Sequence, residues 1–321
     1  IFSPKGMIAL MFLKSYVDCS DRKLIEHLNG NINFQLFCDI LLKGERIDNY
    51  KIVSDIRTYL GKRLNIKEAQ QILSKGWKPF IEQSNIMLTD ATCYESYIRY
   101  PTDVKVLWES VEWVYKKQLF KLCKKFKVKR ARNKFSEQAK KQLSYSKRKR
   151  KTPQQTKARI RALLYLLEKG INQLLDFLLQ NLAAHLSIPD IITFQTVCKV
   201  LEQQRYMFEN EVRRVENRIV SIFKDYVRPI VRGKEKKRVE FGMKVHKVQM
   251  AGLGFVEHMN FDAFNEGVRL DETLKLHKNL TGKSCKKIGL DQIYANNANR
   301  KVITNKEIQS DFSKKGKDTN K

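Results

Sequence analysis

The sequence has almost nothing that suggests zinc binding or disulfide bonds. Its six cysteines contain no CxxC pair, and none of its five histidines has a second ligand beside it at zinc spacing. A zinc finger or zinc ribbon is therefore not expected. Scattered, unpaired cysteines are typical of the reducing cytosol, where the thiol serves as a small apolar group.

Long hydrophobic runs are missing as well. The apolar segment GMIALMFL (residues 6–13) is short and has no small-residue cleavage site. No stretch approaches the roughly 18 uncharged apolar residues of a membrane span, so we expect neither a signal peptide nor a membrane span. RRM and KH signatures are absent too, which disfavours a basic scaffold for RNA. The chain starts at Ile1 without a methionine, and we interpret it as a fragment.

Acidic residues are scarce relative to basic ones. The 321 residues include 63 Lys and Arg but 34 Asp and Glu, which gives a formal net charge of +29 and a pI of about 9.8. This charge indicates a polyanionic partner, with nucleic acid the first candidate and an anionic membrane surface the second. The length allows two domains, or one domain with a large insertion.

The positive charge is most concentrated between Lys116 and Arg161, where twenty Lys and Arg accompany one acid, Glu137. Such a run is either a solvated surface or a phosphate-binding surface, and the near absence of acids favours phosphate contact. Each neutralised phosphate steepens the salt dependence of binding by about one unit. The predicted DNA-binding residues of this run are Lys124, Lys125, Lys129, Arg130, Arg132, Lys147, Arg148, Lys149 and Arg150.

The pattern of residues 1–83 predicts an all-helical domain. One helix covers GMIALMFLKSYVD (6–18), and Ser20 or Asp21 caps a second helix that ends at Gly30. Short helices separated by Gly and Asn are typical of helix-turn-helix modules, but any small helical bundle has the same pattern. DNA contact by this domain and a purely structural role both stay open.

The next segment predicts two short strands around an acid. Residues 86–88 (IML) form an apolar strand that is followed by Thr89 and Asp90, and residues 92–100 form a second β-rich run that stops at Pro101. Asp90 is either a turn aspartate or part of a metal-held active site.

A largely helical stretch follows. Asp103 is predicted to cap a helix, and residues 158–223 are predicted to form a long helical hairpin that is broken at SIPD (187–190). Trp108 and Trp113 are expected in the core rather than as stacking platforms for bases.

Beyond Asp225, alternating apolar residues and glycine turns predict two or three antiparallel strands. A short strand from Ile288 to Leu290 then ends on Asp291. Asp90 and Asp291 therefore have parallel settings, each after a short apolar strand. Carboxylates on adjacent strands can bind two Mg²⁺ ions about 3.5–4 Å apart, although two strand-end acids also occur by chance.

Three stretches resemble the DDE transposases of bacterial insertion sequences, which have a ribonuclease-H-like core. FSPKGMIALMFLKSYVDCSDRKLIEHLNGNINFQLFCDI (2–40) is similar to their N-terminal helical domain. LTDATCYESYIRYPTDVKVLWESV (88–111) is similar to the strands around their first catalytic aspartate. RPIVRGKEKKRVEFGMKVHKV (228–248), FDAFNEG (261–267) and GLDQIYANNANRK (289–301) are similar to the block that leads to the second.

The resemblance implies that Asp90 and Asp291 are the first two acids of a catalytic triad that binds Mg²⁺ or Mn²⁺ as a two-metal site. The fold class that we predict is α/β with a mainly helical remainder. Its parts are an N-terminal helical DNA-binding domain over 1–83, a ribonuclease-H-like core over 84–305 interrupted by a basic helical insertion at about 104–225, and a basic polar tail over 306–321.

The implied activity is hydrolysis of a phosphodiester at the ends of an insertion sequence, then strand transfer by the freed 3′-hydroxyl. The implied partner is double-stranded DNA, at the element ends and at the target. A homodimer on DNA is expected by the same resemblance. The expected location is the bacterial cytoplasm, in association with the nucleoid.

The third acid of this family is a glutamate on a helix well downstream of the second aspartate. Here thirty residues follow Asp291, and their acids, Glu307, Asp311 and Asp318, lie in a polar stretch close behind it. We assign the role to neither Glu307 nor Asp311 and predict a chain truncated before the glutamate, with little or no cleavage activity alone. The alternative is a non-catalytic DNA-binding remnant of a transposase.

Several other residues allow two interpretations. Arg228, Arg232 and Lys234 in RPIVRGK either contact DNA phosphates near the site or lie on a solvated strand edge. His246 is expected to be a strand residue, packed or exposed, rather than a ligand. Tyr294 follows Asp291 by about one turn, so it either shapes the site or packs a helix.

Overall fold

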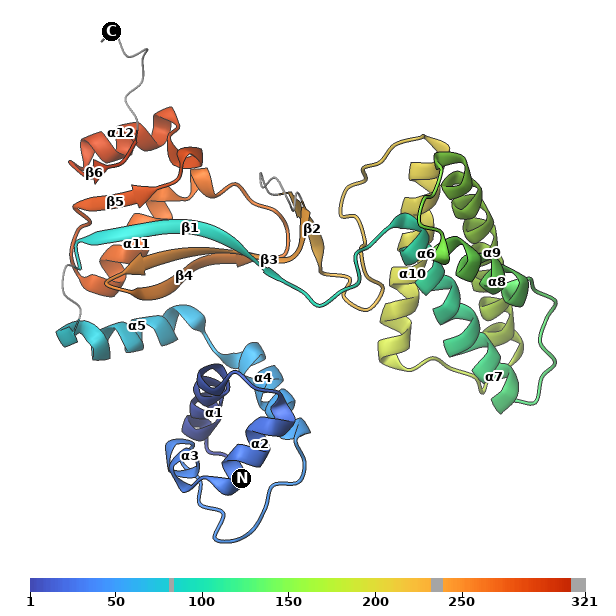
Figure 1. The fold of residues 1–321 in the computed structure, drawn as a ribbon, viewed down its shortest axis with the longest axis horizontal. Helices are drawn as coiled ribbons and strands as arrows, with labels where there is room; N and C mark the ends of the chain where they lie inside the picture. The colour runs from blue at the N-terminus through green and yellow to red at the C-terminus, as the bar shows by residue number, and fades with distance from the viewer. Residues whose placement is uncertain (81–83, 232–238, 313–321) are drawn as a thin grey trace. The chain divides into compact units, whose positions relative to one another are not determined.

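The structure of the protein is a computed structural model that describes residues 1–80, 84–231 and 239–312. The chain divides into two compact units, residues 1–81 and 82–321. The second unit contains a β-sheet and a group of helices, α6 to α10, that we call the helical body (Figure 1). The fold is therefore mixed α/β, with most of its elements helical.

The first unit is helical throughout its described residues. Its helices are α1 (Pro4–Val17), α2 (Asp21–Gly30), α3 (Ile32–Phe37), α4 (Lys51–Arg63) and α5 (Ile66–Trp77), followed by the 3-10 turn η1 (Lys78–Phe80). The Ser20 side chain accepts a hydrogen bond from the Lys23 amide, so Ser20, rather than Asp21, caps α2. Leu10, Leu24 and Leu28 are fully buried in the core of this unit.

The helical body lies in the sequence between the first two strands. Its elements are α6 (Asp103–Glu112), the π-helical η2 (Trp113–Leu119), α7 (Phe120–Lys125), α8 (Phe135–Lys147), α9 (Pro153–Gln180) and α10 (Ile188–Glu209). Leu107, Leu163 and Val197 are fully buried at its centre. Trp113 is buried and Trp108 stacks on Phe135, which confirms that both tryptophans belong to the core.

Two predictions about the helical body are wrong. Thr102 caps α6 with its side chain, while Asp103 is the first helical residue, and its carboxylate pairs with Arg218 and accepts from Gln204. The second arm of the predicted hairpin ends at Glu209 rather than at residue 223. Glu211 has a left-handed backbone (φ 54°), which a helix cannot continue through.

The sheet contains both parallel and antiparallel strands. The strands are β1 (Ile86–Glu95), β2 (Arg228–Val231), β3 (Val239–Met250), β4 (Leu253–Asn260), β5 (Lys287–Leu290) and β6 (Gln309–Ser310). β1 pairs with β3 in antiparallel and with β5 in parallel orientation, and β6 continues parallel to β5. β2 and β4 pair antiparallel with different parts of β3, at 239–242 and 244–250.

The strands predicted after Asp225 and at 288–290 are confirmed. The remaining elements of the second unit are η3 (Glu266–Val268), α11 (Leu270–Thr281), η4 (Gln292–Tyr294) and α12 (Asn297–Asn305). The predicted basic tail begins with a short paired strand, β6, and its residues 313–321 lie outside the described part of the chain.

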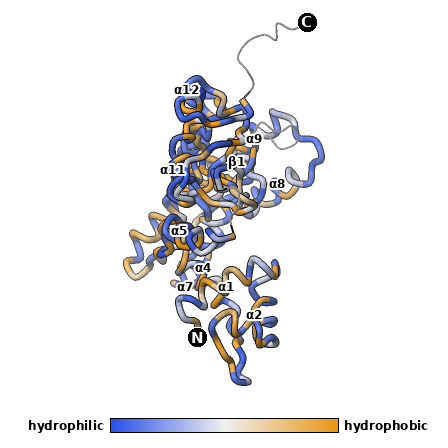
Figure 2. The backbone as a smooth tube through the Cα atoms, turned by 90° about the vertical axis from the view of Figure 1, so that its left-hand side faces the viewer, coloured by the Kyte–Doolittle hydropathy of each residue, from blue (hydrophilic) through white to orange (hydrophobic). Residues whose placement is uncertain are grey.

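All six cysteines are free thiols. Among the described residues, no helix combines the length and the apolar composition needed to cross a membrane, and hydrophilic residues recur along the whole backbone (Figure 2).

Candidate active site and basic surface

Asp90 lies within a strand and not at the end of one. The two predicted strands, 86–88 and the beginning of 92–100, are a single strand, β1, because its pairing with β3 continues from Leu88 to Glu95 without a break. Thr89 and Ala91 on either side of Asp90 are buried, whereas Asp90 itself is exposed. The carboxylate therefore belongs to the open face of the sheet.

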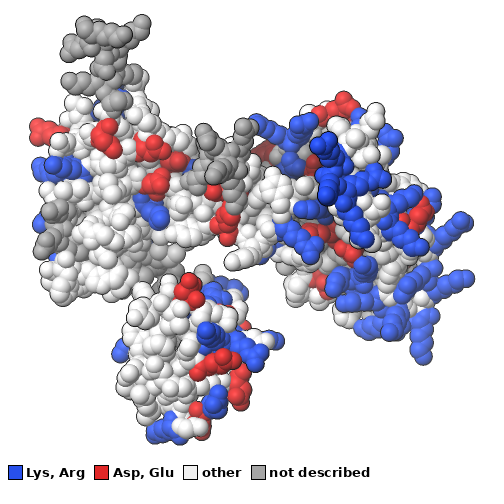
Figure 3. Space-filling view, in the orientation of Figure 1, with Lys and Arg blue, Asp and Glu red and all other residues white. Residues whose placement is uncertain are grey.

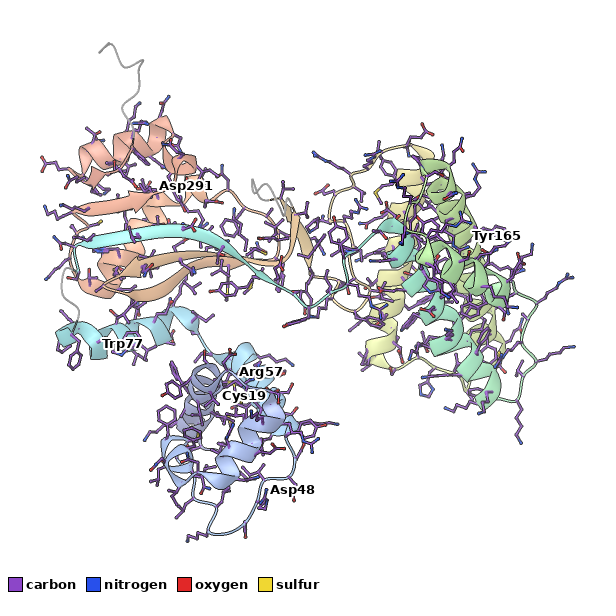
Figure 4. The ribbon with its side chains drawn as sticks, in the orientation of Figure 1. Cys19, Asp48, Arg57, Trp77, Tyr165 and Asp291 are labelled. Atoms are coloured by element: carbon purple, nitrogen blue, oxygen red, sulfur yellow. The ribbon has the colours of Figure 1, made fainter. Side chains whose placement is uncertain are left out.

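Asp291 occupies the neighbouring position on the adjacent parallel strand. The last pair between β1 and β5 is Thr89 with Leu290, so Asp90 and Asp291 are the next residue on each strand. Asp291 is exposed and directly follows β5, where Figure 4 labels it. The register therefore gives the two acids neighbouring backbone positions at the carboxyl end of β5.

One carboxylate oxygen of each acid accepts a hydrogen bond from the backbone amide of the next residue. Asp90 Oδ1 accepts from the Ala91 amide at 2.7 Å, and Asp291 Oδ1 accepts from the Gln292 amide at 2.6 Å, where it caps η4. Within residues 1–80, 84–231 and 239–312, the Oδ2 atoms of these two acids have no hydrogen-bond partner.

Asp311 supports β5 directly before Asp291. Both Asp311 carboxylate oxygens lie near the Leu290 amide nitrogen, at 3.1 and 3.3 Å. Glu307 is exposed just after α12, with a left-handed backbone (φ 51°). No three His, Cys, Asp or Glu side chains in the described part of the chain form a group that could hold a metal ion.

The pair Asp90 and Asp291 fits an open Mg²⁺ site better than a closed one. Mg²⁺ prefers oxygen ligands and usually keeps several waters, binding through one or two carboxylates together with substrate phosphates. Two exposed carboxylates on adjacent strands supply such protein ligands. The remaining positions would be left to water and to a phosphate of the substrate.

A buried polar network lies on the opposite face of β1. His246 of β3 is fully buried, and its Nε2 atom lies 3.0 Å from Thr89 Oγ1 and 2.6 Å from the Tyr294 hydroxyl. The Thr89 hydroxyl donates to the Lys247 carbonyl at 2.9 Å. His246 is thus a packed strand residue, as expected, and Tyr294 is buried beside it.

The other side of the His246 ring is fixed by Glu257. A β-bulge between β3 and β4 leaves Glu257 without a paired residue, because His258 pairs with His246 and Val256 with Lys247. The bulge turns Glu257 inward, where its side chain is 5% exposed and accepts from His246 Nδ1 at 2.7 Å.

The Glu257 carboxyl is held ionised. Burial raises its pKa, but hydrogen bonds from Arg269, at 2.6 Å to each oxygen, and from His246 outweigh burial and lower the pKa from 4.5 to about 2. Burial raises the pKa of the Tyr294 hydroxyl, with the nearby Glu266 charge acting in the same direction, so Tyr294 keeps its proton. Glu257 and Arg269 were not predicted as functional residues, because their only signal in the sequence is polar character near an apolar strand pattern.

Two segments that flank α11, residues 261–267 and residues 289–301, pack against each other. The Gly267 carbonyl accepts from Asn296 Nδ2 at 3.0 Å and from Asn299 Nδ2 at 2.6 Å. A Cβ atom on Gly267 would lie 2.4 Å from the Ile293 carbonyl oxygen, so this position requires glycine. These contacts join residues 261–267 to residues 289–301 and support the turn after Asp291.

The basic run of the sequence forms an exposed surface on the helical body. All nine predicted DNA-binding residues between 124 and 150 are exposed, at the end of α7, in the loop before α8 and at the end of α8. Figure 3 shows Lys and Arg side chains crowding over the helical body. Arg130 lies over the Phe120 ring, 4.3 Å from its centroid.

Not every cation of the run faces solvent. Arg159 is buried, and its guanidinium donates to the Gln142 and Gln138 side chains at 2.8 and 2.6 Å, so it joins α8 to α9. Lys116 and Lys141 are each paired at 2.7 Å with a glutamate of their own helical stretch. The phosphate-binding interpretation therefore does not extend to Arg159.

The Arg228 side chain interacts with groups of the protein itself. It is half-buried at the start of β2, donates to the Asp225 and Val227 carbonyls and lies 3.6 Å from Asp262. Arg232 and Lys234 lie outside the described residues.

No protein-family model, curated protein or solved structure matches this chain.

Proposed function

We propose that this chain is a DDE-type transposase that binds double-stranded DNA and cleaves it with Mg²⁺ or Mn²⁺. The observation that carries the proposal is the placement of Asp90 and Asp291. They are 201 residues apart in the sequence, yet they are the next residues after the last pair, Thr89 with Leu290, of two adjacent parallel strands, and both are exposed.

The strand arrangement supports the proposal. A ribonuclease-H-like core, which the resemblance implies, has three antiparallel strands followed by parallel strands beside the first, with acids on the first strand and after the fourth. The order β4, β3, β1, β5, β6 is compatible with this arrangement, as are the positions of the two acids. The helical body would then be an insertion into the core.

The chemistry that we propose has two steps, hydrolysis of a phosphodiester at the element end and then a transesterification at the target. A water oxygen attacks the phosphorus at the element end and the P–O3′ bond breaks, which leaves a 3′-hydroxyl and a 5′-phosphate. That hydroxyl then attacks a target phosphodiester and releases a target 3′-hydroxyl. A metal ion at Asp90 and Asp291 would supply activation of the attacking group and stabilisation of the leaving oxygen.

The exposed cations of the helical body would hold the DNA. Phosphate contacts of Lys and Arg position DNA without reading its sequence, and they account for much of the affinity at low salt. The nine cations between residues 124 and 150 supply such contacts on one body of the protein.

A cleavage assay tests the proposal. The substrate would be labelled linear DNA that carries the sequences flanking the encoding gene, and the product a fragment with a new 3′-hydroxyl. We expect this chain alone to cleave weakly, since no third acid of the triad is assigned among its residues. The weak cleavage should require Mg²⁺ or Mn²⁺ and should be lost in Asp90→Asn and in Asp291→Asn. Asp271→Asn, which changes an exposed acid on α11, is the matched control and should cleave normally.

The second candidate is a non-catalytic DNA-binding protein. It is favoured by the absence of a three-member metal-ligand group within the described residues. Salt-sensitive DNA binding without cleavage in any variant, and without any effect of the two Asp→Asn changes, would support this candidate over the enzyme.

A further inference from the structure

One nitrogen atom connects the two segments that carry the acids. His246 Nε2 lies 3.0 Å from Thr89 Oγ1 and 2.6 Å from the Tyr294 hydroxyl. Thr89 directly precedes Asp90, and Tyr294 closes the turn that starts at Asp291, since its amide donates to the Asp291 carbonyl at 3.0 Å. The spacing of the two acids is therefore coupled to the bonds of a single imidazole ring.

The ring itself is held from several sides. Glu257 accepts from Nδ1, and Arg269 binds both oxygens of Glu257. His246 and Tyr294 are each 0% exposed, so water does not compete for these bonds. Buried, fully bonded networks restrict the positions of the groups that they join.

We propose that His246, Thr89 and Tyr294 form a positioning link that sets the separation of Asp90 and Asp291 for metal binding. The expected effect on metal binding rests on the proposed function, because that function supplies the metal ion. The expected effect on the backbone beside Asp90 and Asp291 does not depend on it. None of the three residues belongs to the exposed pair of acids, so they are positioning residues and not ligands. A link of this kind supports the ligands as the outer partners of metal sites do.

Tyr294→Phe is the sharpest variant, because it removes only the hydroxyl from the link. We expect the Gln292 amide, which donates to Asp291, to exchange hydrogen at least tenfold faster than in the unmodified protein. We also expect the dissociation constant for Mn²⁺, followed by the paramagnetic resonance of the free ion, to rise about tenfold. Thr89→Val should have the same two effects, and Thr89→Ser, which keeps a hydroxyl, should restore both values.

Tyr115→Phe is the matched control. The Tyr115 hydroxyl is also buried and donates to the Leu166 carbonyl at 3.3 Å, but it lies in the helical body. Its loss should lower the overall stability without changing the exchange of Gln292 or the Mn²⁺ affinity. The comparison separates positioning from a general loss of stability.

Normal Gln292 exchange in Tyr294→Phe would overturn the link, as would equal acceleration in Tyr115→Phe. Faster exchange with an unchanged Mn²⁺ dissociation constant would overturn its role in metal binding. A protein that binds no Mn²⁺, or binds it equally well after Asp90→Asn, would instead contradict the proposed function, and the exchange of Gln292 would then decide the link alone.

Discussion

Glu257 shows how a single residue depends on the fold around it. The sequence places this acid in an ordinary strand pattern, and nothing in the pattern distinguishes it from a surface glutamate. The β-bulge turns it inward, and Arg269 and His246 supply the hydrogen bonds that keep it ionised. Sequence periodicity cannot reveal that the Glu257 side chain points inward, because a bulge shifts the inward and outward positions of a strand by one residue.

We predict that Glu257→Gln lowers the free energy of unfolding by about 3 kcal/mol at pH 7, since it removes the buried carboxylate that pairs with the partly buried Arg269 and the buried His246. The folded pKa of about 2 lies below the ordinary value of 4.5, so this stability is present above about pH 4.5 and is lost as the pH falls toward 2. Denaturant titrations at pH 7 and at pH 3 would measure both effects.

Glu137→Gln is the control, because Glu137 forms an exposed pair with Lys141 on α8. It should leave the free energy of unfolding nearly unchanged, because an exposed ion pair contributes little to stability. An equal loss in the two variants would contradict the role given to the buried network.

At the scale of elements, apolar spacing predicted α1, α2 and β5 but failed in two places. The polar residues Thr89 and Asp90 interrupt the apolar pattern of β1, yet backbone pairing with β3 does not depend on side chains and continues through them. Ile219 and Ile222 have helical spacing but are buried in irregular chain after α10. Packing on a core can produce such spacing without a helix.

The pairing of Asp90 with Asp291 was also only partly predictable. The sequence indicated that each acid follows or borders a short strand, but not which strands are neighbours. That information comes from the parallel register of β1 and β5, which joins residues 201 positions apart.

The contact between η3 and η4 can be tested at Gly267. A methyl group there would lie 2.4 Å from the Ile293 carbonyl oxygen, so Gly267→Ala should lower the free energy of unfolding by about 2 kcal/mol. Gly254→Ala on β4 is the control, since its Cβ would meet no atom within 4 Å. Thermal unfolding of both variants measures the difference, and a Gly267→Ala protein as stable as Gly254→Ala would refute the close contact.

At the scale of the whole molecule, the net charge of +29 is unevenly distributed. Exposed cations crowd over the helical body (Figure 3). The two candidate catalytic acids lie in β1 and directly after β5. Composition alone predicted a polyanionic partner and located the basic run. It could not show that Arg159 is buried and serves to join two helices.

We predict that the quadruple change of Lys147, Arg148, Lys149 and Arg150 to Gln weakens DNA binding and reduces its salt dependence. The slope of log affinity against log salt concentration should fall by about 0.9 for each phosphate contact that is lost. Lys275→Gln on α11 is an exposed control outside the helical body and should leave the slope nearly unchanged. Fluorescence anisotropy with a DNA duplex across a salt series measures the slope, and an unaltered slope in the quadruple variant would exclude this surface.

The most direct test of the central claim is the affinity for Mn²⁺ of the protein bound to DNA, measured for the unmodified chain, Asp90→Asn, Asp291→Asn and the double variant. If the two carboxylates hold one metal site, each single change should weaken binding at least tenfold, and Asp271→Asn should not. The double variant should bind no Mn²⁺ at this site. Equal Mn²⁺ affinity in all five proteins would contradict the account and would leave DNA binding as the function of the chain.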